Sequence, residues 1–166
     1  MDKRKSSKEE EYYRPNVAAL LVNREGRLLI AERIRQRGAW QFPQGGVDEG
    51  EDKKAALLRE MREEIGVAPS LVEIVMSKPG YRYRFPDTMR RYGRNVGQEQ
   101  TYFLCRFLGV DRDIDLRTGK PEFRRFRWIA PHEFQLSWLP PFKREVYRRV
   151  MSDFFGVVLE GEPPSP

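Results

Sequence analysis

The stretch from Gly45 to Val67, GGVDEGEDKKAALLREMREEIGV, constrains the fold of this chain more than any other part. It opens with a turn rich in glycine and acidic residues, where the backbone can bend tightly and approach a phosphate closely. Good helix formers follow without an internal Gly or Pro. Gly66 then stands where a helix stop favours glycine. The pattern predicts a helix over residues 52–65 that begins directly after a tight turn.

Three carboxylates on this helix share one face, because Glu60, Glu63 and Glu64 are spaced at i, i+3 and i+4. A like-charge pair at i, i+4 costs about 0.2–0.5 kcal/mol in an isolated helix, so a cation is expected nearby. Arg59 is four residues before Glu63, the spacing of a helical salt bridge. Clustered oxygen ligands with few His or Cys residues suit magnesium or manganese.

The opposite face of the predicted helix is apolar. Leu58, Met61 and Ile65 follow helical spacing and are expected to be buried. The plain alternative for the acidic face is a solvated surface, the commonest meaning of a charge run. The glycine-rich turn directly before the acidic face argues against that alternative.

The complete pattern resembles a known signature. Gly45, five residues, Glu51, seven residues and then REMREEIGV at 59–67 resemble the Nudix box, with every fixed position filled. The resemblance implies a Nudix hydrolase, which cleaves a nucleoside diphosphate linked to another group. It also implies an α/β fold, an α/β/α sandwich with a mixed central sheet.

Two further motifs narrow the resemblance to one branch of the family. WQFPQGG at 40–46 and YRPNV at 13–17 resemble bacterial RNA pyrophosphohydrolases and the related dinucleoside polyphosphate hydrolases. The similarity extends to about Phe155. It departs at the charged N-terminal arm, in the segment 79–95 and at the two prolines before Phe142.

The composition agrees with one domain that acts on a polyanion. The chain has 166 residues, a formal charge of +6 and one cysteine, Cys105, which is expected to be a core thiol. The positive charge suits a nucleotide or RNA partner, although composition alone does not exclude a merely basic surface. No apolar stretch reaches the ~20 residues of a membrane span, and no signal segment opens the sequence. A cytoplasmic monomer without membrane association is expected.

The chain divides into three predicted parts. Residues 1–12 are expected to form a disordered charged arm, 13–159 one Nudix domain, and 160–166 a disordered tail. Within the domain, strands are predicted by apolar and alternating runs, and a C-terminal helix by its apolar spacing. The predicted strands cover 17–22, 27–33, 40–42, 72–76, 101–107 and 126–129, and the helix covers 143–159.

The resemblance also implies which residues do the chemistry. Glu60, Glu63, Glu64 and Glu122, with the carbonyl of Gly45 or Gly46, would hold one to several Mg²⁺ ions, with Mn²⁺ possible. A carboxylate of the catalytic set would take a proton from water, and the sequence leaves the choice among its members open. That set is Glu63, Glu64 and Glu122, with Arg59 in support.

The expected substrate contacts come mainly from the same resemblance. They are Arg33, Gln44, Tyr83, Gln98, Phe142 and Lys143. Phe142 is expected to stack on a base and Lys143 to reach a phosphate. The segment 79–95 interleaves aromatic residues with arginines, as suits base stacking and phosphate contact. A β-hairpin with packed tyrosines and solvated arginines explains that segment equally well.

The predicted activity is removal of pyrophosphate, or of successive phosphates, from the 5′ end of triphosphorylated RNA, which leaves 5′-monophosphate RNA. The enzymatic alternative is asymmetric hydrolysis of dinucleoside polyphosphates such as diadenosine tetraphosphate. An alternative of another class is a non-catalytic module that binds RNA or nucleotides. Such a module usually lacks some of the box carboxylates, and none is missing in this chain.

Overall fold

A computed structural model describes residues 11–89 and 95–160 of the chain. Short 3₁₀ turns join the main elements. In chain order these are β1 (Tyr12–Val22), β2 (Leu28–Arg33), β3 (Trp40–Gln41), β4 (Gln44–Gly46), α1 (Lys53–Ile65), β5 (Val72–Arg84), β6 (Asn95–Phe107), β7 (Phe123–Ile129) and α2 (Pro141–Phe155).

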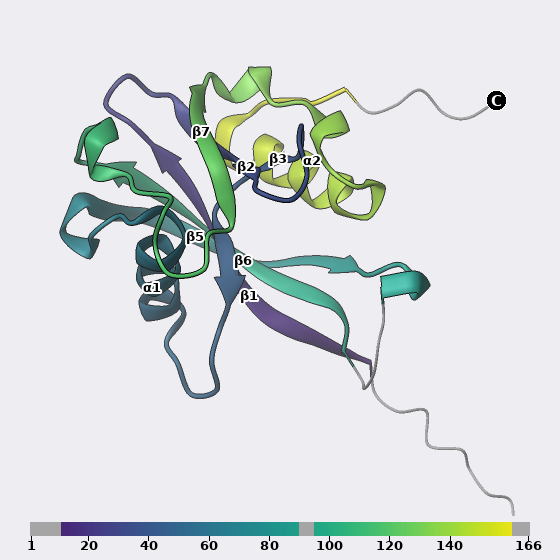
Figure 1. Ribbon diagram of the computed structural model, residues 1–166. Coiled ribbons are helices and arrows are strands. Elements are labelled where there is room, and N and C mark those ends of the chain that lie inside the picture. Colours follow the sequence, from purple (N-terminus) through teal and green to yellow (C-terminus); the bar gives the residue numbers. More distant parts are fainter. Residues whose placement is uncertain (1–10, 90–94, 161–166) are drawn as a thin grey trace, which may run out of the picture.

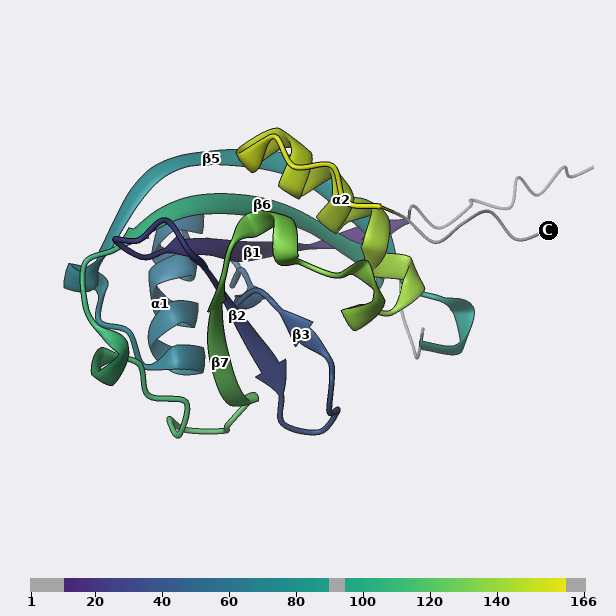
Figure 2. The same ribbon diagram turned by 90° about the horizontal axis from the view of Figure 1, so that it is seen from above.

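The strands form one mixed sheet (Figure 1). Its main path runs β3-β2-β1-β6-β5, while β4 pairs with β1 and β7 with β2. Strands β1 and β6 are parallel, and the other pairs are antiparallel. Helices α1 and α2 lie on opposite sides of the sheet (Figure 2). The predicted α/β/α sandwich with a mixed central sheet is therefore confirmed.

Two hydrophobic layers separate the sheet from its helices. Along β1, Val17 and Ala19 pack in the layer under α1, whereas Ala18 and Leu20 pack in the layer under α2. This alternation follows from the two-residue period of a strand. Cys105 lies in the α1 layer and is fully buried, as expected of a core thiol.

Helix α1 ends at Ile65 before Gly66, as predicted, and begins at Lys53, one residue later than predicted. The Asp52 carboxylate accepts a hydrogen bond from the Ala55 N–H, and Gly66 adopts φ = 68° at the C-terminus. The predicted apolar face needs one correction. Met61 and Ile65 are buried, but the third apolar position of that face is Leu57, and Leu58 is only half-buried. Residues 57, 61 and 65 are four apart, so they form the straighter stripe against the sheet.

Strands β5 and β6 are longer than predicted. β5 continues past Met76 to Arg84, and β6 begins at Asn95 rather than Thr101. In the described part of the aromatic segment, Tyr81 and Tyr83 are buried and belong to β5, which agrees with the hairpin interpretation. Residues 90–94 of the aromatic segment lie outside the described residues.

Strands β1 and β7 begin earlier than predicted, at Tyr12 and Phe123, and both ends of the C-terminal helix move. Helix α2 ends at Phe155, not Leu159, because Gly156 adopts φ = 64° as its stop. It begins at Pro141, where the missing N–H costs no helical hydrogen bond. Most of the predicted arm and tail lie outside the described residues, although Tyr12 belongs to β1. Among the described residues, no helix has the length and apolar character needed to cross a membrane.

Candidate active site

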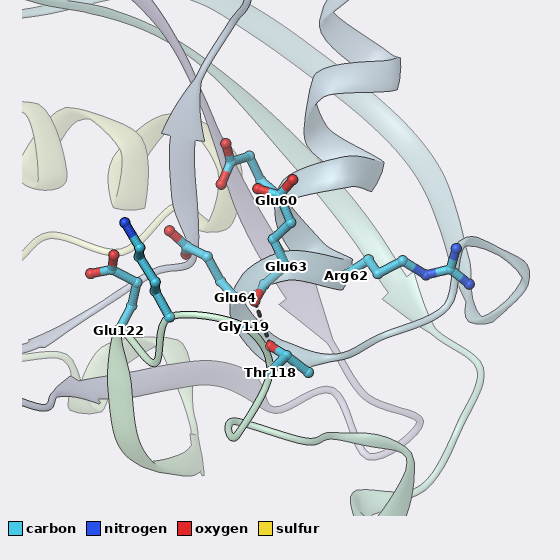
Figure 3. A pocket seen from close by; sticks show the side chains of 8 residues that line it. Glu60, Arg62, Glu63, Glu64, Thr118, Gly119 and Glu122 are labelled. Carbon is cyan, nitrogen blue, oxygen red and sulfur yellow. Dashed lines mark hydrogen bonds between the residues drawn. The ribbon is translucent and has the colours of Figure 1, made fainter.

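An open pocket lies beside the C-terminal half of α1 (Figure 3). Its volume is about 570 Å³. The loop before β7 closes it from the other side and brings in a carboxylate far away in the sequence. The lining residues are Glu60, Arg62, Glu63, Glu64, Thr118, Gly119, Lys120 and Glu122. All four predicted carboxylates therefore meet in one pocket, and those of Glu60, Glu64 and Glu122 point into the same space.

The turn before α1 fits closely around the carboxylates. A Cβ added to Gly45 would lie 1.9 Å from Cδ of Glu60, so only glycine leaves room for that side chain. The N–H of Gln44 donates a 3.1 Å hydrogen bond to Oε2 of Glu64. Both glutamates are thus placed by the backbone of β4. The close approach of Glu60 to Gly45 explains why the motif begins with a glycine.

Arg59 binds several members of the motif at once. Its guanidinium donates two 2.9 Å hydrogen bonds to the two carboxylate oxygens of Glu51. It also lies 2.8 Å from Glu60 and 3.2 Å from Glu63, so the predicted Arg59–Glu63 pair is confirmed. The hydrogen bonds from Arg59 hold the pKa of Glu51 at about 2. Arg59 is not among the residues that line the pocket, so it acts as a positioning residue.

Burial raises the pKa of two carboxylates of the pocket, Glu64 and Glu60. Burial raises the pKa of Glu64 to about 8, against the lowering effect of the Gln44 N–H. Neighbouring carboxylates raise it further. Burial also raises the pKa of Glu60, even though Arg59 is beside it. Carboxylate oxygens that repel one another in this way are the donors that a hard divalent cation takes.

The arrangement of these donors is open. Within residues 11–89 and 95–160, no three His, Cys, Asp or Glu side chains form a closed set of metal ligands. Two carboxylates, Glu60 and Glu63, are paired with Arg59. The donors thus match a divalent cation in chemistry, and Gly45 leaves the space that Glu60 needs beside its backbone.

An aromatic cluster beside the site contains most of the predicted substrate contacts. The ring centroids of Tyr83 and Phe142 are 5.7 Å apart, and Phe85 lies beside both. Nζ of Lys143 lies 5.7 Å from the Tyr83 ring centroid. The Tyr83 hydroxyl donates a short hydrogen bond to the side-chain oxygen of Gln98. The structure therefore brings together Tyr83, Gln98, Phe142 and Lys143.

The last two predicted contacts lie between this cluster and the carboxylates. The pKa of Lys143 is lowered to about 8. Burial is the larger cause, and the nearby positive charge of Arg33 is the second. The side-chain oxygen of Gln44 accepts a 2.7 Å hydrogen bond from Nε2 of Gln100. Gln100 also donates to Asn16 at 2.9 Å and accepts from the Tyr102 hydroxyl at 3.0 Å.

Several residues near the site were not among the predicted candidates. Gln100 fixes Gln44, and its place two residues after Gln98 on the same strand face is the signal that points to it. Thr118 donates a hydrogen bond to the Glu63 carbonyl, and Lys120 lines the pocket. Arg14 lies against Gly46, because a Cβ there would meet its guanidinium at 2.3 Å. No spacing rule points to Thr118, Lys120 or Arg14.

Comparison with known proteins agrees with this geometry. The family described as "NUDIX domain" matches residues 12–150. An RNA pyrophosphohydrolase of Hahella chejuensis is 43% identical over 92% of this chain and 96% of its own length. Another, from Erythrobacter litoralis, is 42% identical over 88% of this chain and 93% of its own length.

Solved structures share the fold at low sequence identity. The E. coli dihydroneopterin triphosphate pyrophosphohydrolase has a TM-score of 0.60 and 15% identity, over 87% of this chain and 97% of that one. A C. elegans Ap4A hydrolase in a binary complex has a TM-score of 0.59 and 17% identity, over 85% of this chain and 98% of that one. At such identities the likeness concerns the fold alone.

Proposed function

Because this chain belongs to the NUDIX domain family, we propose that it removes pyrophosphate, or successive phosphates, from the 5′ end of triphosphorylated RNA. Water adds to a phosphorus atom, a phosphoanhydride bond breaks, and 5′-monophosphate RNA remains. The relatives named RNA pyrophosphohydrolase, which match nearly the whole chain, support RNA as the substrate.

One observation carries the proposal: the acidic pocket and the aromatic cluster are neighbours. Arg33 lines a hollow together with Glu122, and its charge reaches both Lys143 and Tyr83. A substrate can therefore place its phosphates at the carboxylates while a base lies against the rings of Tyr83 and Phe142. Stacking of this kind tolerates any base, as an enzyme acting on many RNA ends requires.

Nudix hydrolases generally use divalent metal ions, and we propose Mg²⁺ here, with Mn²⁺ as a substitute. When bound, such an ion neutralises phosphate charge and lowers the pKa of water. The residues that would hold it are Glu60, Glu63, Glu64 and Glu122, with the Gly45 carbonyl.

The residues of the chain have distinct tasks in this reaction. Arg59 fixes Glu60 and Glu63 in place through its hydrogen bonds. Glu64 and Glu122 point into the pocket, and neither has a Lys or Arg partner within ion-pair distance among the described residues. We therefore assign removal of the proton from the attacking water to Glu64 or Glu122. Lys143 and Arg33 bind phosphate oxygens.

The test compares turnover of two substrates in magnesium. A short 5′-triphosphorylated RNA is expected to have a much higher kcat/KM than diadenosine tetraphosphate. Glu63→Gln is the control and should lose metal-dependent turnover while its melting temperature stays normal. A clear preference for the dinucleotide would make the protein a dinucleoside polyphosphate hydrolase instead. Binding of RNA without turnover in magnesium would revive the non-catalytic module.

A further inference from the structure

A second hollow adjoins the catalytic pocket. Its volume is about 250 Å³, and its lining residues are Arg33, Ile34, Arg35, Lys120, Pro121 and Glu122. Lys120 and Glu122 also line the catalytic pocket, so the two depressions share a wall. We call this depression the side hollow.

The side hollow is held rigidly against the catalytic carboxylate. The N–H of Ile34 donates a 2.9 Å hydrogen bond to the Glu122 carbonyl. The preceding residue, Arg33, pairs with Phe123 in the β2–β7 ladder. Because both walls are joined by backbone hydrogen bonds, the backbone that carries the arginines keeps a fixed place beside Glu122.

The two depressions have opposite charge. Among their lining residues, the catalytic pocket has four glutamates against Arg62 and Lys120, while the side hollow has three cations against Glu122. None of those three cations has a carboxylate partner within ion-pair distance among the described residues. The neighbouring acid, Glu32, is held by Arg124 and Arg125 instead. A concentration of unpaired positive charge attracts an anion.

We propose that the side hollow binds the RNA backbone 3′ of the terminal nucleotides, an inference that rests on the proposed function. The terminal phosphates belong at the acidic pocket, where cations gather. Arg33 lies between the aromatic cluster and the side hollow, so a chain that stacks a base on Phe142 can continue over Arg33 into it. Ile34 is 45% exposed and offers an apolar contact to a sugar or base there.

This assignment separates RNA from small nucleotides. A nucleoside triphosphate or a dinucleoside polyphosphate has no 3′–5′ phosphodiester, so it offers the side hollow no RNA backbone to bind. RNA with several nucleotides fills it. Arg35 is the residue to change, because it is exposed and does not line the catalytic pocket.

The experiment measures binding of 5′-monophosphorylated RNA hexamer and of guanosine monophosphate across a salt series, for the wild type, Arg35→Ala and Arg27→Ala. Arg27 precedes the other end of β2, about 20 Å from Arg33 at ~3.3 Å per residue, and serves as the control. Arg35→Ala should weaken hexamer binding several-fold and reduce the salt slope by ~0.7, the value for one phosphate contact on a single strand. Guanosine monophosphate binding should not change.

Each result decides a separate question. If Arg35→Ala weakens binding of the hexamer and of guanosine monophosphate equally, the side hollow binds the terminal phosphate instead. If hexamer binding does not change, the side hollow does not bind RNA. Either result overturns the inference. Turnover of the triphosphorylated hexamer is measured in parallel. If the hexamer binds through Arg35 but is not hydrolysed, the inference stands and the proposed function fails. If it is hydrolysed and Arg35→Ala changes nothing, only the inference fails.

Discussion

Nη2 of Arg59 lies 2.9 Å from the carbonyl oxygen of Gly46, and this hydrogen bond ties α1 to the turn that precedes it. The same guanidinium holds Glu51 and Glu60. The Arg59 side chain therefore links three parts of the motif: the glycine turn, the acidic residue Glu51 and helix α1. Gly46 and Glu51 must lie within hydrogen-bond distance of Arg59, which limits the number of residues that can separate them in the motif.

Arg59→Lys is expected to lower both stability and kcat, because an ammonium group cannot replace a planar fork with several partners. The substitution removes hydrogen bonds to charged groups, and their contribution is reduced because Arg59 is partly exposed. We expect the free energy of unfolding to fall by about 1–2 kcal/mol. Urea denaturation measures it. Arg62→Lys is the matched control, since Arg62 points away from Glu60 and Glu64 (Figure 3). Equal effects of the two substitutions would contradict the role of Arg59.

Gly45→Ala should reduce kcat with little loss of fold, because the new methyl group would displace the flexible Glu60 side chain. The check is a double-mutant cycle with Glu60→Ala. If the clash with Glu60 is the cause, the two substitutions together should cost hardly more than Glu60→Ala alone. Additive losses would mean that Gly45 matters for another reason.

Glu64→Gln should abolish turnover and yet stabilise the metal-free protein. The pKa of Glu64 rises from an ordinary 4.5 to about 8 on folding, so its ionisation opposes folding. The gain from the neutral amide is absent below pH 4.5, grows between pH 4.5 and 8, and reaches about 1–3 kcal/mol. Thermal melts at several pH values measure it, and added magnesium should shrink the difference. If Glu64→Gln melted at a lower temperature than the wild type at pH 8 without metal, this explanation would be wrong.

Phe142→Ala should raise KM for RNA more than it lowers kcat. Loss of one base stack is worth about 1–3 kcal/mol, roughly a 5- to 160-fold change in affinity. Phe155→Ala, at the other end of α2 in the same hydrophobic layer, controls for lost packing. If kcat alone fell, stacking on Phe142 would be the wrong explanation.

The lowered pKa of Lys143 predicts that kcat/KM for RNA decreases at high pH. Burial, with the charge of Arg33, lowers its pKa to about 8, so the ammonium loses its charge above that pH. Accordingly, kcat/KM for RNA should fall above pH 8, because this ratio reports the free enzyme. Lys143→Arg keeps its charge and should remove the fall. An unchanged pH profile in that variant would exclude Lys143 as the group responsible.

Local signals were sufficient to predict α1 and its two ends from the sequence. A side chain that accepts from the first turn and a glycine with positive φ depend only on neighbouring residues. The same holds for the pair Arg59–Glu63. The approach of Glu122 to the box was different, because only the family resemblance indicated it.

The C-terminal end of β5 was mispredicted for a physical reason, while its start at Val72 agrees with the prediction. Pro79 and Gly80 suggest a turn, but the strand continues through them, with a register shift between Lys78 and Tyr81. Gly80 adopts φ = 88°, which such an irregularity permits. Tyr81 then resumes the alternation toward the core. Lys120 remained unnoticed because a single lysine in a polar loop has no pattern that reveals its neighbours in space.

The parallel pairing of β1 with β6 has a consequence for how the chain acquires its shape. Asn16 and Gln100 are 84 positions apart, yet their side chains are hydrogen-bonded and buried in the finished sheet. A ribosome adds about 5–20 residues per second, so β1 waits several seconds for its partner. During that time β2 and β4, which follow β1 directly in the chain, are its available partners, while the edge of β1 that later pairs with β6 stays open to a strand from another chain.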